Sequence, residues 1–233
     1  MTQIAFGYDI KKDAWSWVLI AKAKSHWGRD IKSQVVHIPD DLLKKILNNP
    51  RPKAEAFVVE YLKNHPRRKY REKVINEEIK ALENIWRTKE IEYFKILEKV
   101  TQKLIYRKNF GAYYTSGFMC PYNIAQAWFM VSMWHNIPFS IGTICHEVMH
   151  LQFHYYYEKW CLEKGLSKDQ FQDLKESLTF LLNEPEFENI ILQNELGYPD
   201  HLKLRTQLKK LWQKEKNFEL FLEKAIDLTK SNK

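Results

Sequence analysis

Residues 71–107 contain neither glycine nor proline, and this absence of helix breakers limits what the chain can fold into. Apolar side chains, among them Ile75, Leu82 and Trp86, recur at helical spacing between alternating charges. Such a pattern is typical of an amphipathic helix with one buried side. We therefore expect one long helix, or two nearly continuous helices, over this segment.

Shorter stretches with the same periodicity lie on both sides of this segment. They predict helices over residues 13–24, 40–47, 53–63, 167–184 and 201–230. Ser167 and Gln170 form a capping box at the start of the fourth of these helices. A short extended piece is expected over residues 33–38. Because the predicted helices together cover most of the sequence, we expect a mainly helical chain.

Two segments before residue 140 have the composition of strands. Residues 111–123, GAYYTSGFMCPYN, are aromatic and contain two glycines, and residues 127–133, AWFMVSM, form a short apolar run that a buried helix would fit as well. Together they predict a small antiparallel sheet next to the helix that follows. The expected fold class is α+β and predominantly α-helical.

The positive charge is concentrated in the first half of the sequence. Residues 1–110 hold 24 Lys and Arg against 14 Asp and Glu, whereas residues 111–233 hold 13 against 15. We divide the chain into a basic helical N-terminal region, 1–108, and a second region, 109–233, within one compact unit. The densest basic run, HPRRKYREK at 65–73, could make a weak nucleic-acid contact, but a solvated helix start is favoured because no RNA-binding motif or DNA-reading helix accompanies it.

The sequence favours a cytoplasmic protein without membrane contact. The first residues show no signal-peptide pattern, and the most apolar window, 128–153, carries His146, Glu147 and His150, which a membrane span would hold only at high cost. The three cysteines are odd in number and widely spaced, so they form no disulfide framework.

The segment TICHEVMHLQFH, 143–154, places three histidines and a glutamate in an otherwise apolar helix that we expect from Ser140 to Lys164. His146 and His150 are four residues apart, so both imidazoles lie on one face and can reach one cation. Zinc binds neutral imidazole and lowers the pKa of a bound water, whose proton Glu147 can accept. This is the H-E-x-x-H pattern of metallopeptidases, and satisfied core histidines are the alternative.

A third ligand must come from outside this motif. The metzincin pattern is excluded because Phe153 and Tyr156 stand where it needs glycine and histidine. His154 shares the face of the other histidines but lies about 12 Å along the helix axis from His146. We therefore expect His154 to contact a ligand or to line the cleft.

Glu176 is the preferred third ligand. It lies on the next predicted helix, 26 residues after His150, and a turn at Gly165 allows that helix to fold back antiparallel. A solvent-facing glutamate is the alternative for this residue. Glu184, directly before Pro185, is the reserve candidate.

At these residues the chain resembles the gluzincin group of zinc metallopeptidases over residues 111–184. The resemblance implies His146, His150 and Glu176 as the ligands of one Zn²⁺ per chain, with Glu147 as general base and acid. It also implies that the strand at 127–133 binds extended substrate.

The sequence departs from the gluzincin motif NExxSD on the glutamate helix. Lys175 replaces the asparagine, and Phe180 replaces the aspartate that would orient a ligand histidine. Hydrolysis also needs a group that stabilises an oxyanion. His201, with Tyr198 nearby, is the candidate, although a residue without a role at a helix start fits as well.

Two functions follow from these patterns. The first is a zinc-dependent metallopeptidase that hydrolyses peptide bonds of a peptide or protein substrate through a metal-activated water, with Glu147 as general base. The alternative is a non-catalytic, metal-stabilised binding protein whose basic N-terminal half contacts nucleic acid or a protein partner.

Overall fold

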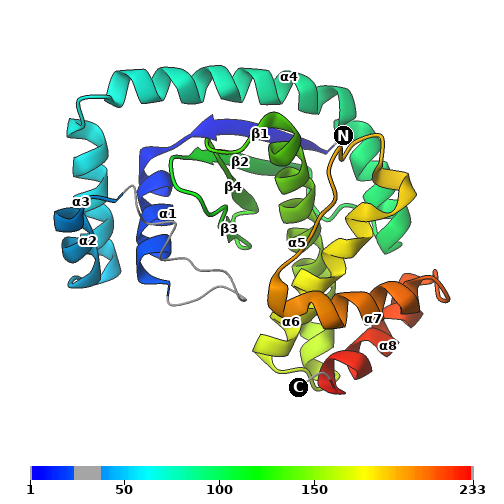
Figure 1. Cartoon of the computed structure of the whole chain (residues 1–233). Helices are drawn as coiled ribbons and strands as arrows, with labels where there is room; N and C mark the ends of the chain where they lie inside the picture. Colours follow the sequence, from blue (N-terminus) through cyan, green and yellow to red (C-terminus); the bar gives the residue numbers. More distant parts are fainter. Residues whose placement is uncertain (1, 24–37, 232–233) are drawn as a thin grey trace.

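Helices account for most of the computed structural model, which describes residues 2–23 and 38–231 (Figure 1). In chain order they are α1 Ile10–Lys22, α2 Asp40–Leu47, α3 Arg51–Asn64, α4 Arg68–Thr101, α5 Ile137–Glu163, α6 Lys168–Leu178, α7 Leu202–Trp212 and α8 Phe218–Ser231. With four short strands, they confirm the predicted α+β, predominantly helical class. The extended piece expected at 33–38 lies, except for its last residue, outside the described residues.

The sheet is mixed, where the sequence suggested an antiparallel one. Its strands are β1 Gln3–Tyr8, β2 Asn109–Thr115, β3 Tyr122–Asn123 and β4 Trp128–Ser132, in the order β1-β2-β4-β3. β1 and β4 both pair with β2 in parallel, and only β3 and β4 are antiparallel. The link over 116–127 is long enough for a crossover, so β4 runs in the same direction as β2.

α4 confirms the long helix expected from the segment without glycine or proline. It starts three residues before the predicted range and ends at Thr101, because Gln102 adopts a left-handed conformation with φ 53°. Glu90 on its buried side accepts hydrogen bonds from Ile4 N at 2.7 Å and from Trp86 Nε1 at 2.9 Å. α4 is thereby attached to β1, across the top of Figure 1.

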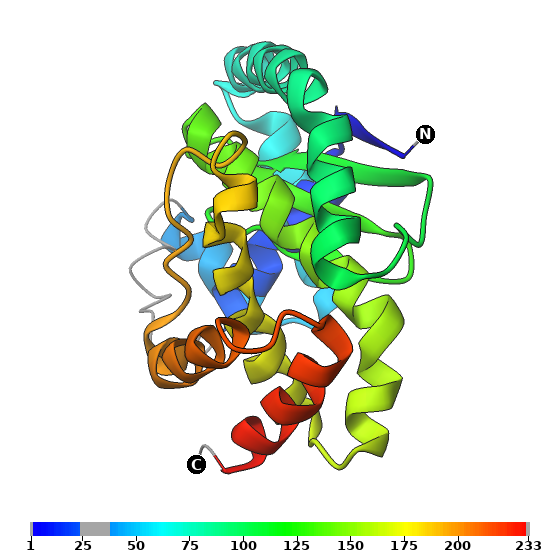
Figure 2. The same cartoon turned by 90° about the vertical axis from the view of Figure 1, so that its right-hand side faces the viewer.

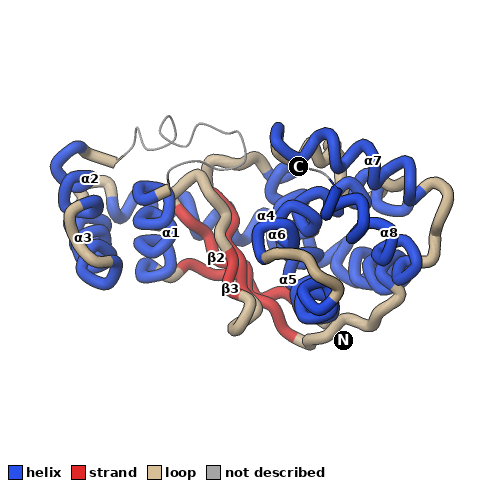
Figure 3. The backbone as a smooth tube through the Cα atoms, turned by 90° about the horizontal axis from the view of Figure 1, so that it is seen from below, coloured by secondary structure: helices blue, strands red, loops and turns tan. Residues whose placement is uncertain are grey.

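One main core holds the sheet, α4, α5 and the C-terminal helices together. Ile4, Trp86, Phe129 and Leu151 are fully buried in it, so residues on both sides of position 108 share this core. A smaller apolar cluster joins α1, α2 and α3. Figure 3 shows the strands between these three helices and α5 to α8. In Figure 2, α4 runs from the top down towards α8, whose first residue donates a hydrogen bond from Phe218 N to Gln102 Oε1 at 3.0 Å.

The C-terminal half contains two interruptions that the periodicity did not predict. α6 ends at Leu178 and continues as a 3-10 helix, Thr179–Asn183, and the helix expected over 201–230 is divided into α7 and α8.

Among the described residues, no helix has both the length and the apolar character that crossing a bilayer requires.

Candidate metal centre

α5 carries the HEVMH motif through the centre of the core. It begins at Ile137, earlier than the predicted Ser140, because the Asn136 side chain accepts a hydrogen bond from Phe139 N at 2.9 Å and caps the helix. Val148 and Leu151 are fully buried. A histidine or glutamate on such a helix is costly unless another group compensates it.

His146 and His150 on α5 meet Glu176 on α6. α6 begins after a turn at Gly165, whose φ is 96°, and the predicted Ser167–Gln170 capping box is confirmed. Glu176 Oε2 lies 3.5 Å from His146 Nε2 and 3.1 Å from His150 Nε2. The ligand atoms of the three residues lie within 4.8 Å of one another, so the group could hold a metal ion.

Two atoms of this group are buried, and neither has a hydrogen-bond partner among the described residues. His150 Nε2 and Glu176 Oε2 face each other, but their contact does not have hydrogen-bond geometry. Burial raises the pKa of Glu176, yet the attraction of His150 and Lys175 outweighs it and holds this pKa well below its usual value. Buried polar atoms without partners are rare and costly, and a cation between them would satisfy both, so these residues fit a metal ion.

The second oxygen of Glu176 is bound to a buried lysine. Lys175 Nζ lies 2.8 Å from Glu176 Oε1 and donates a hydrogen bond to Tyr122 Oη at 2.6 Å. Only 2% of Lys175 is exposed. Lys175, which stands where the gluzincin motif has an asparagine, is thus the charge partner of the candidate ligand Glu176.

His146 has a carboxylate on its other side. Its Nδ1 lies 3.5 Å from Glu195 Oε2, in the loop between α6 and α7. Burial alone would raise the pKa of Glu195. The nearby charges of His146 and Arg205 outweigh this effect, so the pKa of Glu195 falls to about 2. Metal-binding histidines usually give their second nitrogen such a partner.

Glu195 is the residue that sequence reasoning missed. Phe180 stands where the gluzincin motif has an aspartate that orients a ligand histidine. In this chain the carboxylate that faces His146 comes from a different segment, at Glu195. Its backbone is fixed by two hydrogen bonds with the Asn183 side chain, of 2.7 and 2.9 Å, and one from Arg205 at 2.6 Å. No periodicity or spacing in the sequence connects this loop with α5.

Glu147 lies next to His146 and points into the protein. It is 7% exposed, and within the described part of the chain its Oε2 has no hydrogen-bond partner. Burial raises the pKa of Glu147 to about 8, with a contribution from Glu176 and against the opposing charge of His146. A buried carboxyl group beside the metal-binding group is suited to proton transfer.

The other predicted site residues lie outside the candidate metal-binding group of His146, His150 and Glu176. His154 contacts Tyr122 Oη through Nε2 and Glu158 Oε2 through Nδ1, both at 3.1 Å. His201 is buried with its Nε2 3.1 Å from Asp173 Oδ1, so its expected oxyanion role stays a prediction. Glu184, the reserve ligand, accepts hydrogen bonds from Trp212 and Lys216 instead.

β4, the strand expected to bind substrate, lies between β2 and β3 in the sheet. Trp128 and Phe129 therefore pair with β3, and the backbone of the next residue, Met130, donates to Pro121 O at 3.0 Å. These three positions are occupied by the chain itself. An extended substrate therefore cannot pair with β4 at these positions, as the sequence suggested, and would have to pair with a different strand edge.

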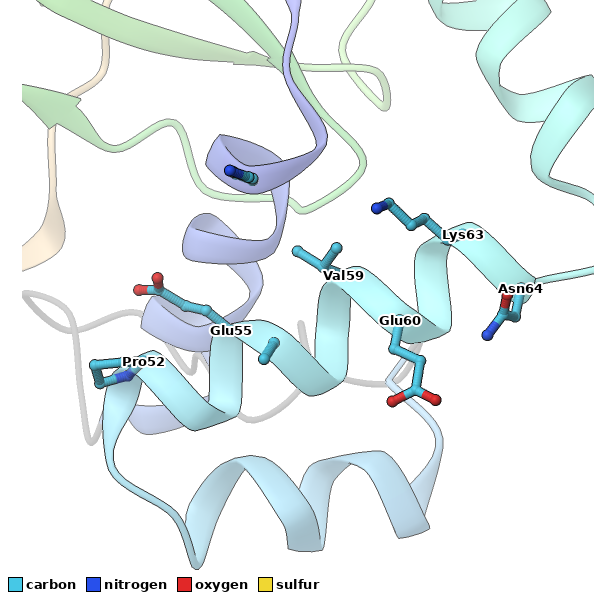
Figure 4. Close-up of a pocket in the computed structure, with 8 residues that line it drawn as sticks. Pro52, Glu55, Val59, Glu60, Lys63 and Asn64 are labelled. Atoms are coloured by element: carbon cyan, nitrogen blue, oxygen red, sulfur yellow. The ribbon is translucent and has the colours of Figure 1, made fainter.

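The remaining sequence candidates lie elsewhere in the fold. In the basic run at 65–73, Arg68 pairs with Glu72 at 2.7 Å and Arg71 donates to Leu62 O at 2.8 Å. A hollow of about 510 Å³ lies against α3, beside Pro52, Val59 and Lys63 (Figure 4). No residue of the candidate metal-binding group lines this hollow.

Comparison with known proteins gave no match to a family model, to a curated protein or to a solved structure. The resemblance to gluzincins accordingly rests on the sequence motif alone and stays a prediction.

Proposed function

We propose that the protein is a zinc-dependent metallopeptidase, in which His146, His150 and Glu176 bind one zinc ion per chain. The observation that carries this proposal is the group of two imidazoles and one carboxylate, in which the buried atoms His150 Nε2 and Glu176 Oε2 have no hydrogen-bond partner in the described part of the chain. Two histidines and a glutamate are one of the ligand sets that hydrolytic zinc sites use.

The chain's own groups divide the chemistry between them. A zinc ion held by His146, His150 and Glu176 would act as a Lewis acid, which would polarise a carbonyl oxygen and make a water more acidic. Glu147 accepts the proton of the attacking water and passes it to the leaving amine as the peptide bond breaks. Glu195 holds the His146 ring from the side away from Glu176.

Glu147→Gln tests this assignment, because it removes the base while keeping the size of the side chain. We expect the variant to lose hydrolysis of a mixed peptide library, read by mass spectrometry, and to keep its metal. Glu163→Gln makes the same change at an exposed end of α5 and should cleave like wild type. Full cleavage by a metal-loaded Glu147→Gln protein would refute the assignment.

The non-catalytic alternative makes the opposite forecast. Its support is the positive charge of the N-terminal half. Within the 65–73 run, however, Arg68 and Arg71 already have partners in the protein, which weakens this support. A metal-loaded wild type that cleaves no library peptide but shifts nucleic acid in a salt-dependent gel assay would favour it.

A further inference from the structure

Lys175 is a charged side chain in the protein interior, directly beside a candidate metal ligand. It is 2% exposed, and its ammonium group lies between Glu176 Oε1 and Tyr122 Oη. The Nζ atom also stands 4.8 Å from the centre of the Tyr122 ring. Lysine is almost never buried to this degree without partners, so these contacts compensate its burial.

The two oxygens of the Glu176 carboxylate have different partners. Oε1 lies 2.8 Å from the Lys175 ammonium, whereas Oε2 faces the Nε2 atoms of His146 and His150 at 3.5 and 3.1 Å. As long as Lys175 holds Oε1, a cation between the imidazoles can reach only one oxygen of this ligand.

Lys175 is itself held in place from its far side. An ammonium group only donates, so the Tyr122 oxygen accepts from Lys175 and its hydroxyl proton is free to bond His154 Nε2 at 3.1 Å. His154 Nδ1 then donates to Glu158 Oε2 at 3.1 Å. The chain of contacts joins α6, β3 and α5, so the position of Lys175 depends on three elements of the fold.

We propose that Lys175 is a positioning residue that restricts Glu176 to one metal-ligating oxygen and so keeps a fourth coordination position open. This inference rests on the proposed zinc site. Hydrolytic zinc sites combine three protein ligands with an open position for water or substrate. A Glu176 that bound through both oxygens would take that position, and a bound water would then make the site five-coordinate.

Cobalt(II) in place of zinc reports the coordination number, because four-coordinate cobalt absorbs visible light far more strongly than five- or six-coordinate cobalt. The full chain would be loaded with cobalt as wild type, Lys175→Met and Tyr122→Phe. Lys168→Met, exposed on the same helix, and Tyr155→Phe, exposed on α5, are matched controls. Circular dichroism would establish that each variant is folded.

We expect the visible absorption per bound cobalt to fall several-fold in Lys175→Met and by a smaller factor in Tyr122→Phe, with both controls like wild type. A folded, cobalt-loaded Lys175→Met with the wild-type spectrum would overturn the inference and leave the metal site standing. If Lys175→Met does not fold, an unchanged Tyr122→Phe spectrum would overturn it. A wild type that binds no cobalt would refute the metal site itself.

Discussion

Replacing Glu195 by alanine removes the carboxylate that faces His146, which also accepts a hydrogen bond from Gly197 N at 2.9 Å. The backbone of Glu195 stays bound to the side chains of Asn183 and Arg205, at 2.6 to 2.9 Å. In the proposed zinc site, the substitution acts on the orientation of His146 and on the basicity of the nitrogen that would bind the metal.

The size of the effect follows from the contact. Losing the partner of a metal-bound histidine typically weakens metal binding about 10- to 100-fold. The 3.5 Å between His146 Nδ1 and Glu195 Oε2 exceeds the roughly 2.7–3.2 Å of a strong N–H···O hydrogen bond, which places this case low in the range. We expect zinc affinity to fall about tenfold, equivalent to about 1.4 kcal/mol.

Competition with a chromophoric chelator measures this affinity directly. Glu188→Ala removes an exposed carboxylate from the segment between α6 and α7 and should leave zinc affinity unchanged. An unchanged affinity in Glu195→Ala, or an equal loss in Glu188→Ala, would show that Glu195 does not position His146.

Three further substitutions test the described packing. Asp13 accepts hydrogen bonds of 2.8 to 2.9 Å from Tyr8, Thr115 and Ser116, so Asp13→Ala should lower the free energy of unfolding by about 3 kcal/mol or more in urea denaturation; a loss below about 1 kcal/mol would contradict this network. Burial lowers the pKa of His135 from 6.5 to about 4, so only the unfolded chain gains this proton between those pH values. Wild type should consequently lose more thermal stability than His135→Gln between pH 7 and pH 5, and equal losses would refute the assignment. Apart from the adjoining backbone of α5, no described atom lies within 4 Å of a Cβ added to Gly142, so Gly142→Ala should raise the free energy of unfolding by about 0.5–1 kcal/mol, and a lower melting temperature would speak against it.

The helices could be predicted because each depends on local sequence. The range without glycine or proline became α4, and the Ser167–Gln170 capping box stands at the start of α6. The HEVMH spacing placed two imidazoles on one face of α5, and the Gly165 turn brought Glu176 to them. All of these features arise from neighbours a few residues apart or from one short connection.

Features that depend on distant partners could not be predicted in the same way. β1 is a six-residue strand that pairs with β2 about a hundred residues later, so no local signal marks it. Glu195 reaches His146 from a loop whose position depends on Asn183 and Arg205. The parallel direction of β4 likewise follows from the crossover over 116–127 and not from the apolar pattern of the strand.

Metal content tests the central claim most directly. The protein would be purified without added zinc or chelator and analysed by mass spectrometry as wild type, Glu176→Ala, Glu184→Ala and His154→Ala. We predict one zinc ion per chain, lost in Glu176→Ala and kept in the other two variants. A wild type without metal even after zinc addition, or a Glu176→Ala variant that keeps its zinc, would contradict the site described for His146, His150 and Glu176.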